Sequence, residues 1–315
     1  MEQRRVGSSG LQVSALGLGC NNFGGRMDAA AAARVVHAAL DLGVTHFDTA
    51  DTYPMGVGRA SEEILGRALK GRRQDAVVAT KCGKPMDASG RMQGASRLYL
   101  CAAVEASLRR LDTEHIDLLY VHQPDPDTPV GETLAALDDL IRAGKVRYVA
   151  ASNCAAWQIV EAEWTARAAG LNRYIATQEQ YSLIARGVER ELLPVCKRYG
   201  LGLVPYFPLA SGILTGKYCS GQAAPEGTRL ATAKGLAELF LTEANLALAE
   251  RLGAFAAERG RTLLDLAFAW LLRDPVVPSV IAGASTPEQL QANAKACTWT
   301  LSAADAAEVG ARLGG

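Results

Sequence analysis

The sequence predicts an α/β protein folded as a (β/α)8 TIM barrel, with an N-terminal β-hairpin and extra C-terminal helices. Short apolar or β-branched runs recur at intervals of roughly thirty residues, and a longer segment with helical periodicity follows each one. Eight such repeats can be distinguished. Glycines follow several helical segments at the position that favours a left-handed cap: Gly43, Gly144, Gly170 and Gly200. The length of 315 residues suits one barrel domain spanning residues 1–315.

The elements can be placed in chain order. A hairpin is expected from residues 4–6 and 11–13 around a Gly-Ser-Ser-Gly turn, where it would close the bottom of the barrel. The predicted strands are residues 14–19, 44–47, 76–80, 116–121, 146–151, 174–177, 201–206 and 278–281. Predicted helices between them include residues 28–42, 97–111, 133–143 and 155–169.

The regular spacing breaks between the last two strands. That interval holds a polar loop at 219–228 and two helical stretches, around 243–258 and 262–273, of which one exceeds the barrel pattern. A final helix is expected at 302–313. The alternative fold, a doubly wound sheet, favours a glycine fingerprint after the first strand. Gly17 and Gly19 are followed by Cys20, Asn21 and Asn22, so that fingerprint is missing.

Composition excludes several classes of protein. Hydrophobic residues form 49% and charged residues 21% of the chain, as in a globular protein with a large core. The 33 Lys and Arg balance the 33 Asp and Glu, so no overall charge attracts nucleic acid or an anionic membrane. Because no apolar run reaches the length of a signal peptide or a membrane span, we expect a cytoplasmic protein. The seven cysteines never form a CxxC pair, which predicts free thiols and no metal site.

Polar residues gather at the predicted strand ends. The second strand leads into Asp48 and Tyr53, the third ends at Lys81, and the fourth ends at His122. In a TIM barrel these ends meet around one point, where the active site lies. A carbonyl that accepts a hydride needs a proton donor and polar neighbours for its oxygen. Tyr53 would be that donor, Lys81 would lower the pKa of its phenol, and Asp48 would hold Lys81.

Longer motifs around these residues resemble the aldo-keto reductase family nearly end to end. They include Phe47-Asp48-Thr49-Ala50-Asp51-Thr52-Tyr53, Ser61-Glu62-Glu63-Ile64-Leu65-Gly66, Ala79-Thr80-Lys81, Ile116-Asp117-Leu118-Leu119-Tyr120-Val121-His122, Gln178-Glu179-Gln180-Tyr181-Ser182 and Gly283-Ala284-Ser285. The resemblance implies a catalytic tetrad of Asp48, Tyr53, Lys81 and His122, with Tyr53 as general acid and His122 orienting the carbonyl.

The resemblance also implies a bound nicotinamide dinucleotide. Ser152, Asn153 and Gln178 would hold the carboxamide, and Tyr206 would stack on the nicotinamide ring. Lys217 would close over the pyrophosphate. The full set of expected cofactor contacts is Cys20, Asn21, Asp48, Ser152, Asn153, Gln178, Tyr206, Phe207, Pro208, Leu209, Ser211, Gly212, Lys217, Arg229, Gly283, Ser285, Gln289 and Asn293. A helix starting near Thr286-Pro287-Glu288 would direct backbone N–H groups at the adenosine end.

The choice of dinucleotide stays open at this stage. Members selective for NADP often carry Lys or Arg where Gly283 and Gln289 stand, whereas Arg229 is a candidate replacement for the 2'-phosphate contact. Phe207 replaces a frequent Ser on the phosphate path. We therefore expect NADP(H), with NAD(H) as the alternative cofactor.

Three functions follow as hypotheses. The first is an NADP(H)-dependent reductase of small aldehydes or ketones, or a catalyst of the reverse oxidation of the alcohol. The second is an NAD-dependent sugar or alcohol dehydrogenase. The third is a cofactor-sensing regulatory subunit, since the motifs also resemble the beta subunits of voltage-gated potassium channels; His122 stands where that branch usually has Asn, which favours turnover. The substrate, partly set by residues 84–95, and the oligomeric state are not predicted.

Overall fold

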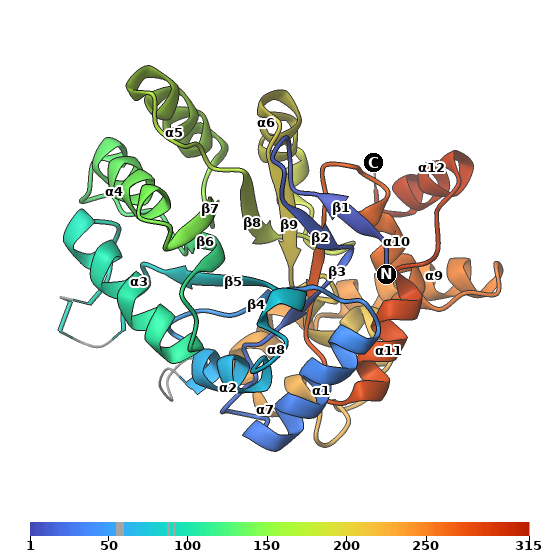
Figure 1. Ribbon diagram of the computed structural model, residues 1–315. Coiled ribbons are helices and arrows are strands. Elements are labelled where there is room, and N and C mark those ends of the chain that lie inside the picture. The colour runs from blue at the N-terminus through green and yellow to red at the C-terminus, as the bar shows by residue number, and fades with distance from the viewer. Residues whose placement is uncertain (55–59, 87–88, 91, 315) are drawn as a thin grey trace.

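The computed structural model describes residues 1–54, 60–86, 89–90 and 92–314. Within these residues, eight parallel strands follow the order β10-β3-β4-β5-β6-β7-β8-β9. Their bounds are β3 (Leu16–Gly19), β4 (His46–Asp48), β5 (Val77–Cys82), β6 (Ile116–Val121), β7 (Val146–Ser152), β8 (Ala176–Gln180), β9 (Gly202–Tyr206) and β10 (Val280–Ala282). The backbone N–H of Leu203 donates to the carbonyl of Val276, just before β10, at 2.8 Å. The two ends of the sheet thus meet, and the predicted barrel is confirmed (Figure 1).

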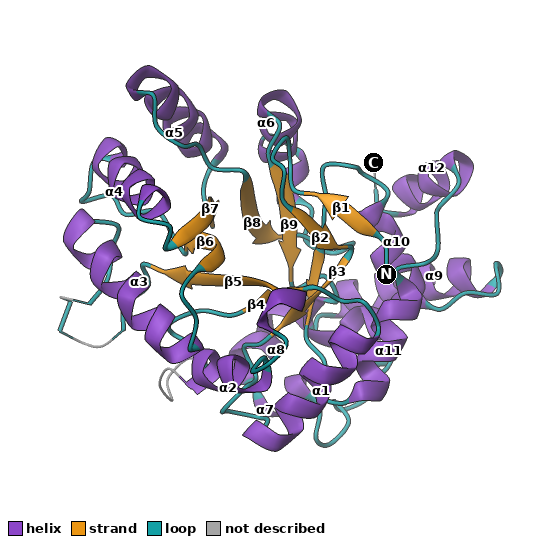
Figure 2. Ribbon diagram, in the orientation of Figure 1, coloured by secondary structure: helices purple, strands orange, loops and turns teal. Residues whose placement is uncertain are grey.

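Helices surround the strands, as Figure 2 shows. They are α1 (Ala29–Asp41), α2 (Ala60–Ala68), α3 (Arg97–Leu111), α4 (Val130–Arg142), α5 (Ala156–Ala169), α6 (Leu192–Tyr199), α9 (Glu243–Ala257), α10 (Leu263–Leu272), α11 (Pro287–Ala296) and α12 (Ala303–Arg312). Local sequence accounts for their ends. Asp28 caps α1 by accepting from the Ala31 N–H, and Gly170 ends α5 with φ of 66°. The helix α9 packs on α10 and α12, and is the extra helix expected from the spacing.

The N-terminal hairpin joins β1 (Gln3–Arg5) to β2 (Gln12–Ser14). Val6 and Val13 are buried in one cluster with barrel-interior residues of β5, β6 and β9, including Ala79, Leu118 and Val204. The hairpin therefore closes the N-terminal end of the barrel, as predicted, and leaves the opposite end for polar residues.

Some predicted boundaries were wrong. The helix α4 begins at Val130 rather than 133, directly after Pro129, whose fixed φ suits a helix start. The strand β8 was placed at 174–177 but spans Ala176–Gln180, and its polar side chains have partners inside the fold, such as Asp48 for Gln178. Three short helices after β9 were missed: η3 (Ala210–Thr215), α7 (Arg229–Thr232) and α8 (Lys234–Phe240). Their sequences are too short for helical periodicity to be recognised.

The described residues include no helix long and apolar enough to span a membrane. They also contain no group of three or more His, Cys, Asp or Glu arranged to hold a metal ion.

Candidate active site

Asp48, Lys81 and His122 lie at the C-terminal ends of β4, β5 and β6, so the barrel brings these three predicted residues together. The Lys81 ammonium donates to Asp48 Oδ2 at 2.6 Å and to the carbonyl of Thr49 at 2.8 Å. The side chains of Lys81 and Asp48 are only 1% and 5% exposed. Burial alone would lower the pKa of Lys81, but the Asp48 carboxylate, together with Tyr53 and Cys20, outweighs burial and raises that pKa. Lys81 is therefore a fixed positive charge.

Tyr53, from the loop after β4, completes the predicted cluster. The Lys81 Nζ lies 5.1 Å from the centre of the Tyr53 ring. The rings of Tyr53 and His122 meet edge to face, with centroids 5.8 Å apart. All four residues of the predicted tetrad are thus in one cluster at the mouth of the barrel.

The pKa of Tyr53 differs in direction from the sequence-based expectation. Burial raises this pKa, and although the charge of Lys81 lowers it, the net direction is upward. The expected effect of Lys81 is present, but desolvation is larger. Tyr53 consequently carries its proton near neutral pH, and Lys81 stabilises the phenolate that would remain after the proton leaves.

His122 has a different electrostatic character. Its side chain is buried, and burial together with the charges of Lys81 and Lys84 lowers its pKa to about 2. Nδ1 is buried without a hydrogen-bond partner in the described part of the chain. His122 is therefore a neutral imidazole at physiological pH, able to donate one hydrogen bond but unable to supply a proton as an imidazolium. This arrangement favours Tyr53 over His122 as the acid.

The second oxygen of Asp48 has a partner that the sequence did not indicate. Gln178 Nε2 donates to Asp48 Oδ1 at 2.8 Å, across the barrel from β8 to β4. Gln178 was expected to hold a carboxamide, and its side chain also fixes the carboxylate that holds Lys81. The carbonyl oxygen of the same amide is still available to another donor.

Ser152, Asn153 and Tyr206 form a second polar cluster beside the first. Asn153 has a positive φ of 57°, and its Nδ2 donates to the His122 carbonyl at 2.9 Å and to Ser152 Oγ at 3.0 Å. The Tyr206 hydroxyl donates to Asn153 Oδ1 at 2.8 Å. The amide of Asn153 thus links the β6 end to the β9 end.

The segment after β9 has an unusual backbone. Phe207, Ala210, Ser211 and Gly212 all have positive φ, of 53°, 45°, 56° and 103°. Leu209, with φ of −102° and ψ of 12°, precedes Ala210 in the left-handed region, and such a right-to-left pair forms a concave backbone nest that attracts anions. Ser211 Oγ is buried and has no hydrogen-bond partner in the described residues.

Two predicted cations lie beside this segment. A Cβ placed on Gly212 would be 3.1 Å from Lys217 Nζ, so the lysine lies directly over the glycine. The Arg229 guanidinium lies 5.1 Å from the centre of the Phe207 ring. Neither cation forms an ion pair with any carboxylate among the described residues. A nest, an orphaned hydroxyl and two unpaired cations together fit a phosphate-bearing ligand.

Comparison with known proteins agrees with this geometry. A model described as the aldo/keto reductase family matches residues 15–312. The chain belongs to the aldo/keto reductase family. It is 39% identical over 305 residues to a probable voltage-gated potassium channel subunit beta of Arabidopsis thaliana, covering 94% of this chain and 91% of that protein.

Two relatives are named as reductases. The chain is 36% identical over 311 residues to L-glyceraldehyde 3-phosphate reductase of Escherichia coli (strain K12), covering 94% of this chain and 87% of that protein. It is 34% identical over 301 residues to versiconal hemiacetal acetate reductase of Aspergillus parasiticus, covering 87% and 86%. This aldo/keto reductase is accordingly an oxidoreductase, and its family typically uses NADP(H).

The predicted adenosine end of this aldo/keto reductase lies at the start of α11. Thr286 caps that helix by accepting from the Gln289 N–H, and Pro287 follows as its first residue, as the sequence indicated. Gln289 Oε1 accepts from the Ser285 N–H at 2.8 Å, and Asn293 Nδ2 donates to the Gly283 carbonyl at 3.4 Å. Gly283 is exposed and brings no charge. Arg229 therefore remains the predicted contact for a 2'-phosphate.

The two expected cofactor contacts after β3, Cys20 and Asn21, differ in their exposure to solvent. Cys20 is fully buried and its backbone N–H and carbonyl are paired with the Asp48 carbonyl and the Ser61 hydroxyl, whereas Asn21 is partly exposed. Residues that the sequence missed lie close by: Lys84, just after β5, and Tyr120, two residues before His122 on the same strand face. Their nearness to the strand ends was the available signal.

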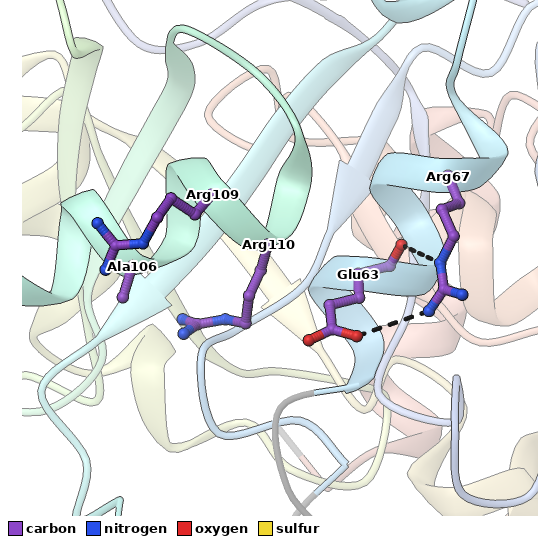
Figure 3. Close-up of a pocket in the computed structure, with 5 residues that line it drawn as sticks. All are labelled: Glu63, Arg67, Ala106, Arg109 and Arg110. Atoms are coloured by element: carbon purple, nitrogen blue, oxygen red, sulfur yellow. Dashed lines mark hydrogen bonds and ion pairs between the residues drawn. The ribbon is translucent and has the colours of Figure 1, made fainter.

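A surface hollow of about 440 Å³ lies elsewhere, between α2 and α3 on the outside of the barrel. Glu63 and Arg67 line it from one helix, and Arg109 and Arg110 from the other (Figure 3). Arg110 also pairs with buried Glu62 at 2.6 Å. These contacts join two outer helices and bring no residue of the polar cluster into the hollow.

Proposed function

We propose that this aldo/keto reductase transfers a hydride reversibly between NADP(H) and a small aldehyde or ketone, with Tyr53 as the proton donor. The proposal depends mainly on one observation: Lys81, ion-paired to Asp48 at 2.6 Å, lies 5.1 Å from the centre of the Tyr53 ring. A bound nicotinamide supplies the hydride. Everything else that the reaction needs comes from the chain itself.

Two side chains, those of His122 and Tyr53, act on the carbonyl oxygen of the substrate. Neutral His122 donates a hydrogen bond that orients and polarises the carbonyl, and the Tyr53 hydroxyl transfers its proton as negative charge develops on that oxygen. The Lys81 ammonium then stabilises the phenolate of Tyr53. Asp48 and Gln178 keep Lys81 in place. In the oxidative direction, the same phenolate accepts the proton of the alcohol.

The geometry around β7, β8 and β9 supports the proposed cofactor contacts. Ser152, Asn153 and Gln178 would hold the carboxamide, Tyr206 would lie against the nicotinamide ring, and the nest around Ser211 and Gly212 would receive the pyrophosphate. Lys217 and Arg229 supply the positive charge on that path. A preference for NADPH is supported by Arg229.

Lys84 indicates which class of substrate the site would favour. This half-buried lysine forms no ion pair within the described residues, yet its charge contributes to the low pKa of His122. Asp125, on the loop after β6, is occupied by the Ala95 N–H and the Thr128 hydroxyl, both at 2.7 Å. The charge of Lys84 beside His122 supports a substrate with an anionic group. L-glyceraldehyde 3-phosphate is therefore the first compound to test.

The experiment is a panel of aldehydes and ketones with NADPH and NADH, followed by absorbance of the reduced nicotinamide. Glyceraldehyde 3-phosphate and glyceraldehyde form a matched pair that differs in the phosphate. Turnover of any member of the panel with NADPH supports the proposal. Absence of turnover across the panel, with NADPH bound normally, would favour a cofactor-sensing subunit instead.

An NAD-dependent sugar or alcohol dehydrogenase is the second candidate, and one observation favours it. Gly283 is exposed, and a Cβ there would meet only Asn22 within 4 Å, at 3.8 Å, so the adenosine end has room but no charge of its own. Dissociation constants for NADP⁺ and NAD⁺ on one preparation distinguish the two candidates.

A further inference from the structure

The Lys81 ammonium has a second aromatic neighbour besides Tyr53. Its Nζ lies 5.8 Å from the centre of the Tyr120 ring, on the strand next to its own. The β5–β6 register pairs Lys81 directly with Tyr120. Tyr120 is fully buried. The ammonium therefore has a phenol ring at the barrel mouth and another in the barrel interior.

Packing alone does not explain a tyrosine at this position. The Tyr120 hydroxyl is buried and faces the Gln178 side chain, without a hydrogen bond of good geometry in the described structure. A buried hydroxyl without a partner destabilises a fold, so a purely structural role would favour an apolar side chain of similar size. What the ring adds is its electron-rich face, which attracts a cation most strongly where water is excluded.

We propose that Tyr120 is a positioning residue of the reaction: its ring face holds the charged Lys81 Nζ against Tyr53. The inference rests on the proposed function, in which Lys81 stabilises the Tyr53 phenolate. With hydrogen bonds to Asp48 and to the Thr49 carbonyl on one side, Lys81 needs a favourable surface on the interior side. Tyr120 provides it without adding a second negative charge that would draw Lys81 away from Tyr53.

Other ionisable groups lie around Lys81, and each could contribute to the pH dependence of the oxidative rate. They are Cys20 after β3, His46 and Asp48 on β4, Tyr53 in the next loop, Lys84 after β5 and His122 on β6. Burial keeps Cys20 as a thiol and His46 neutral at physiological pH, since it raises the pKa of the thiol and lowers that of His46 to about 4. Tyr53 and Lys84 are thus the groups among them expected to titrate on the alkaline side of the oxidative reaction, since burial and the charge of Lys81 lower the pKa of Lys84.

The test compares Tyr120→Leu and Tyr120→Phe in both directions. Loss of the ring should lower kcat about tenfold, and should move the alkaline limb of the oxidative pH profile up by about one unit, because a cation–π contact in a desolvated site is of that size. The carbonyl KM and the dissociation constant for NADPH should stay within about twofold. Tyr120→Phe keeps the ring and should restore both kcat and the pH profile.

Tyr148→Leu is the matched control. Tyr148 lies on β7, one layer lower in the same interior cluster, with no ring contact to Lys81 in the described structure. Its loss should lower stability without moving the pH profile. If Tyr120→Leu behaves like Tyr148→Leu, with an unshifted profile, the inference is wrong.

A second series keeps the volume of the side chain constant, in case Tyr120→Leu does not fold. Phenylalanine and ring-fluorinated phenylalanines at position 120 weaken the ring face stepwise at nearly constant shape. We expect kcat to fall with each fluorine, whereas a flat series would overturn the inference. Tyr53→Phe is measured beside them: if that variant stays active, the proposed function fails, and if it is inactive while the series is flat, only the role of Tyr120 fails.

Discussion

The Tyr206 hydroxyl donates a hydrogen bond of 2.8 Å to Asn153 Oδ1, and so connects the ring expected to lie against nicotinamide with the amide beside His122. From the sequence, Tyr206 was predicted to stack on the nicotinamide ring. The structure gives the hydroxyl a structural partner. Asn153 has a positive φ of 57°, which asparagine adopts more readily than most residues, and the Tyr206 hydroxyl fixes the orientation of its amide.

Tyr206→Phe should therefore have a measurable effect. Loss of one hydrogen bond to a partly buried amide costs about 1 kcal/mol, so NADPH binding should weaken by roughly fivefold. Tyr206→Ala also removes the stacking surface and should weaken binding by about 1 to 3 kcal/mol more. Fluorescence titration with NADPH measures both variants. Equal affinity of Tyr206→Phe and the unmodified protein would show that the hydroxyl contributes nothing to the site.

Arg229 should determine the choice of dinucleotide. Arg229→Met should weaken NADPH by about ten- to a hundredfold and leave NADH nearly unchanged, since a charge-assisted contact contributes roughly 1.5 to 3 kcal/mol. Lys234→Met, an exposed lysine a few residues along the chain, is the control and should affect neither cofactor. Equal losses for NADPH and NADH in Arg229→Met would exclude a contact with the 2'-phosphate.

His46 should make stability depend on pH. This histidine is fully buried in the barrel, where Nδ1 lies 3.0 Å from Ser279 Oγ and where Asp48, Lys81 and Asp117 are its charged neighbours. Burial lowers its pKa from 6.5 to about 4. Between these values the unfolded chain binds a proton that the folded protein does not, so stability is lost as pH falls from 6.5 towards 4.

Urea unfolding of the unmodified protein and of His46→Gln at several pH values isolates this effect. The free energy of unfolding of the unmodified protein should fall relative to the variant by up to about 1.4 kcal/mol per pH unit below pH 6.5. Above pH 7 the difference should be constant. Parallel curves from pH 7.5 to 4.5 would mean that His46 is not held neutral by the fold.

The sequence predicted that Asp48, Tyr53, Lys81 and His122 lie together, because these residues stand at or just after strand ends. Asp48, Lys81 and His122 end successive parallel strands, so a barrel must bring them together. The partners across the barrel were not predictable in this way. Gln178 reaches Asp48 from β8, and Tyr206 reaches Asn153 from β9, through side-chain rotamers that no local pattern encodes.

Electrostatics were also harder to predict than topology. The sequence indicated that Lys81 would lower the pKa of Tyr53, but the size of the opposing desolvation depends on how closely the barrel mouth packs. The nest after β9 was missed as a helical element because positive φ at Phe207, Ala210 and Ser211 is unusual for residues other than glycine. The cofactor contacts of Cys20, Ser285, Gln289 and the other expected residues stay predictions.

Lys81→Met tests the charge behind the proton donor. The phenol of Tyr53 would remain, but its pKa would lose the lowering effect of Lys81 and rise further. Reduction near neutral pH should fall by at least about a hundredfold, and oxidation should recover in part as pH rises towards the pKa of the phenol. Steady-state rates from pH 6 to 10.5 measure this recovery. A pH profile with the shape of the unmodified protein would separate Lys81 from Tyr53.

The proton donor itself is tested most directly by Tyr53→Phe, with NADPH titration and steady-state reduction measured on one preparation. The change removes a hydroxyl and leaves the ring that packs edge to face on His122, so folding and NADPH affinity should be retained. Turnover should fall by about 10⁴-fold or more, because general acid catalysis and a hydrogen bond to the developing alkoxide are lost together. A Tyr53→Phe protein that binds NADPH normally and reduces its best substrate within about tenfold of the unmodified rate would contradict this mechanism.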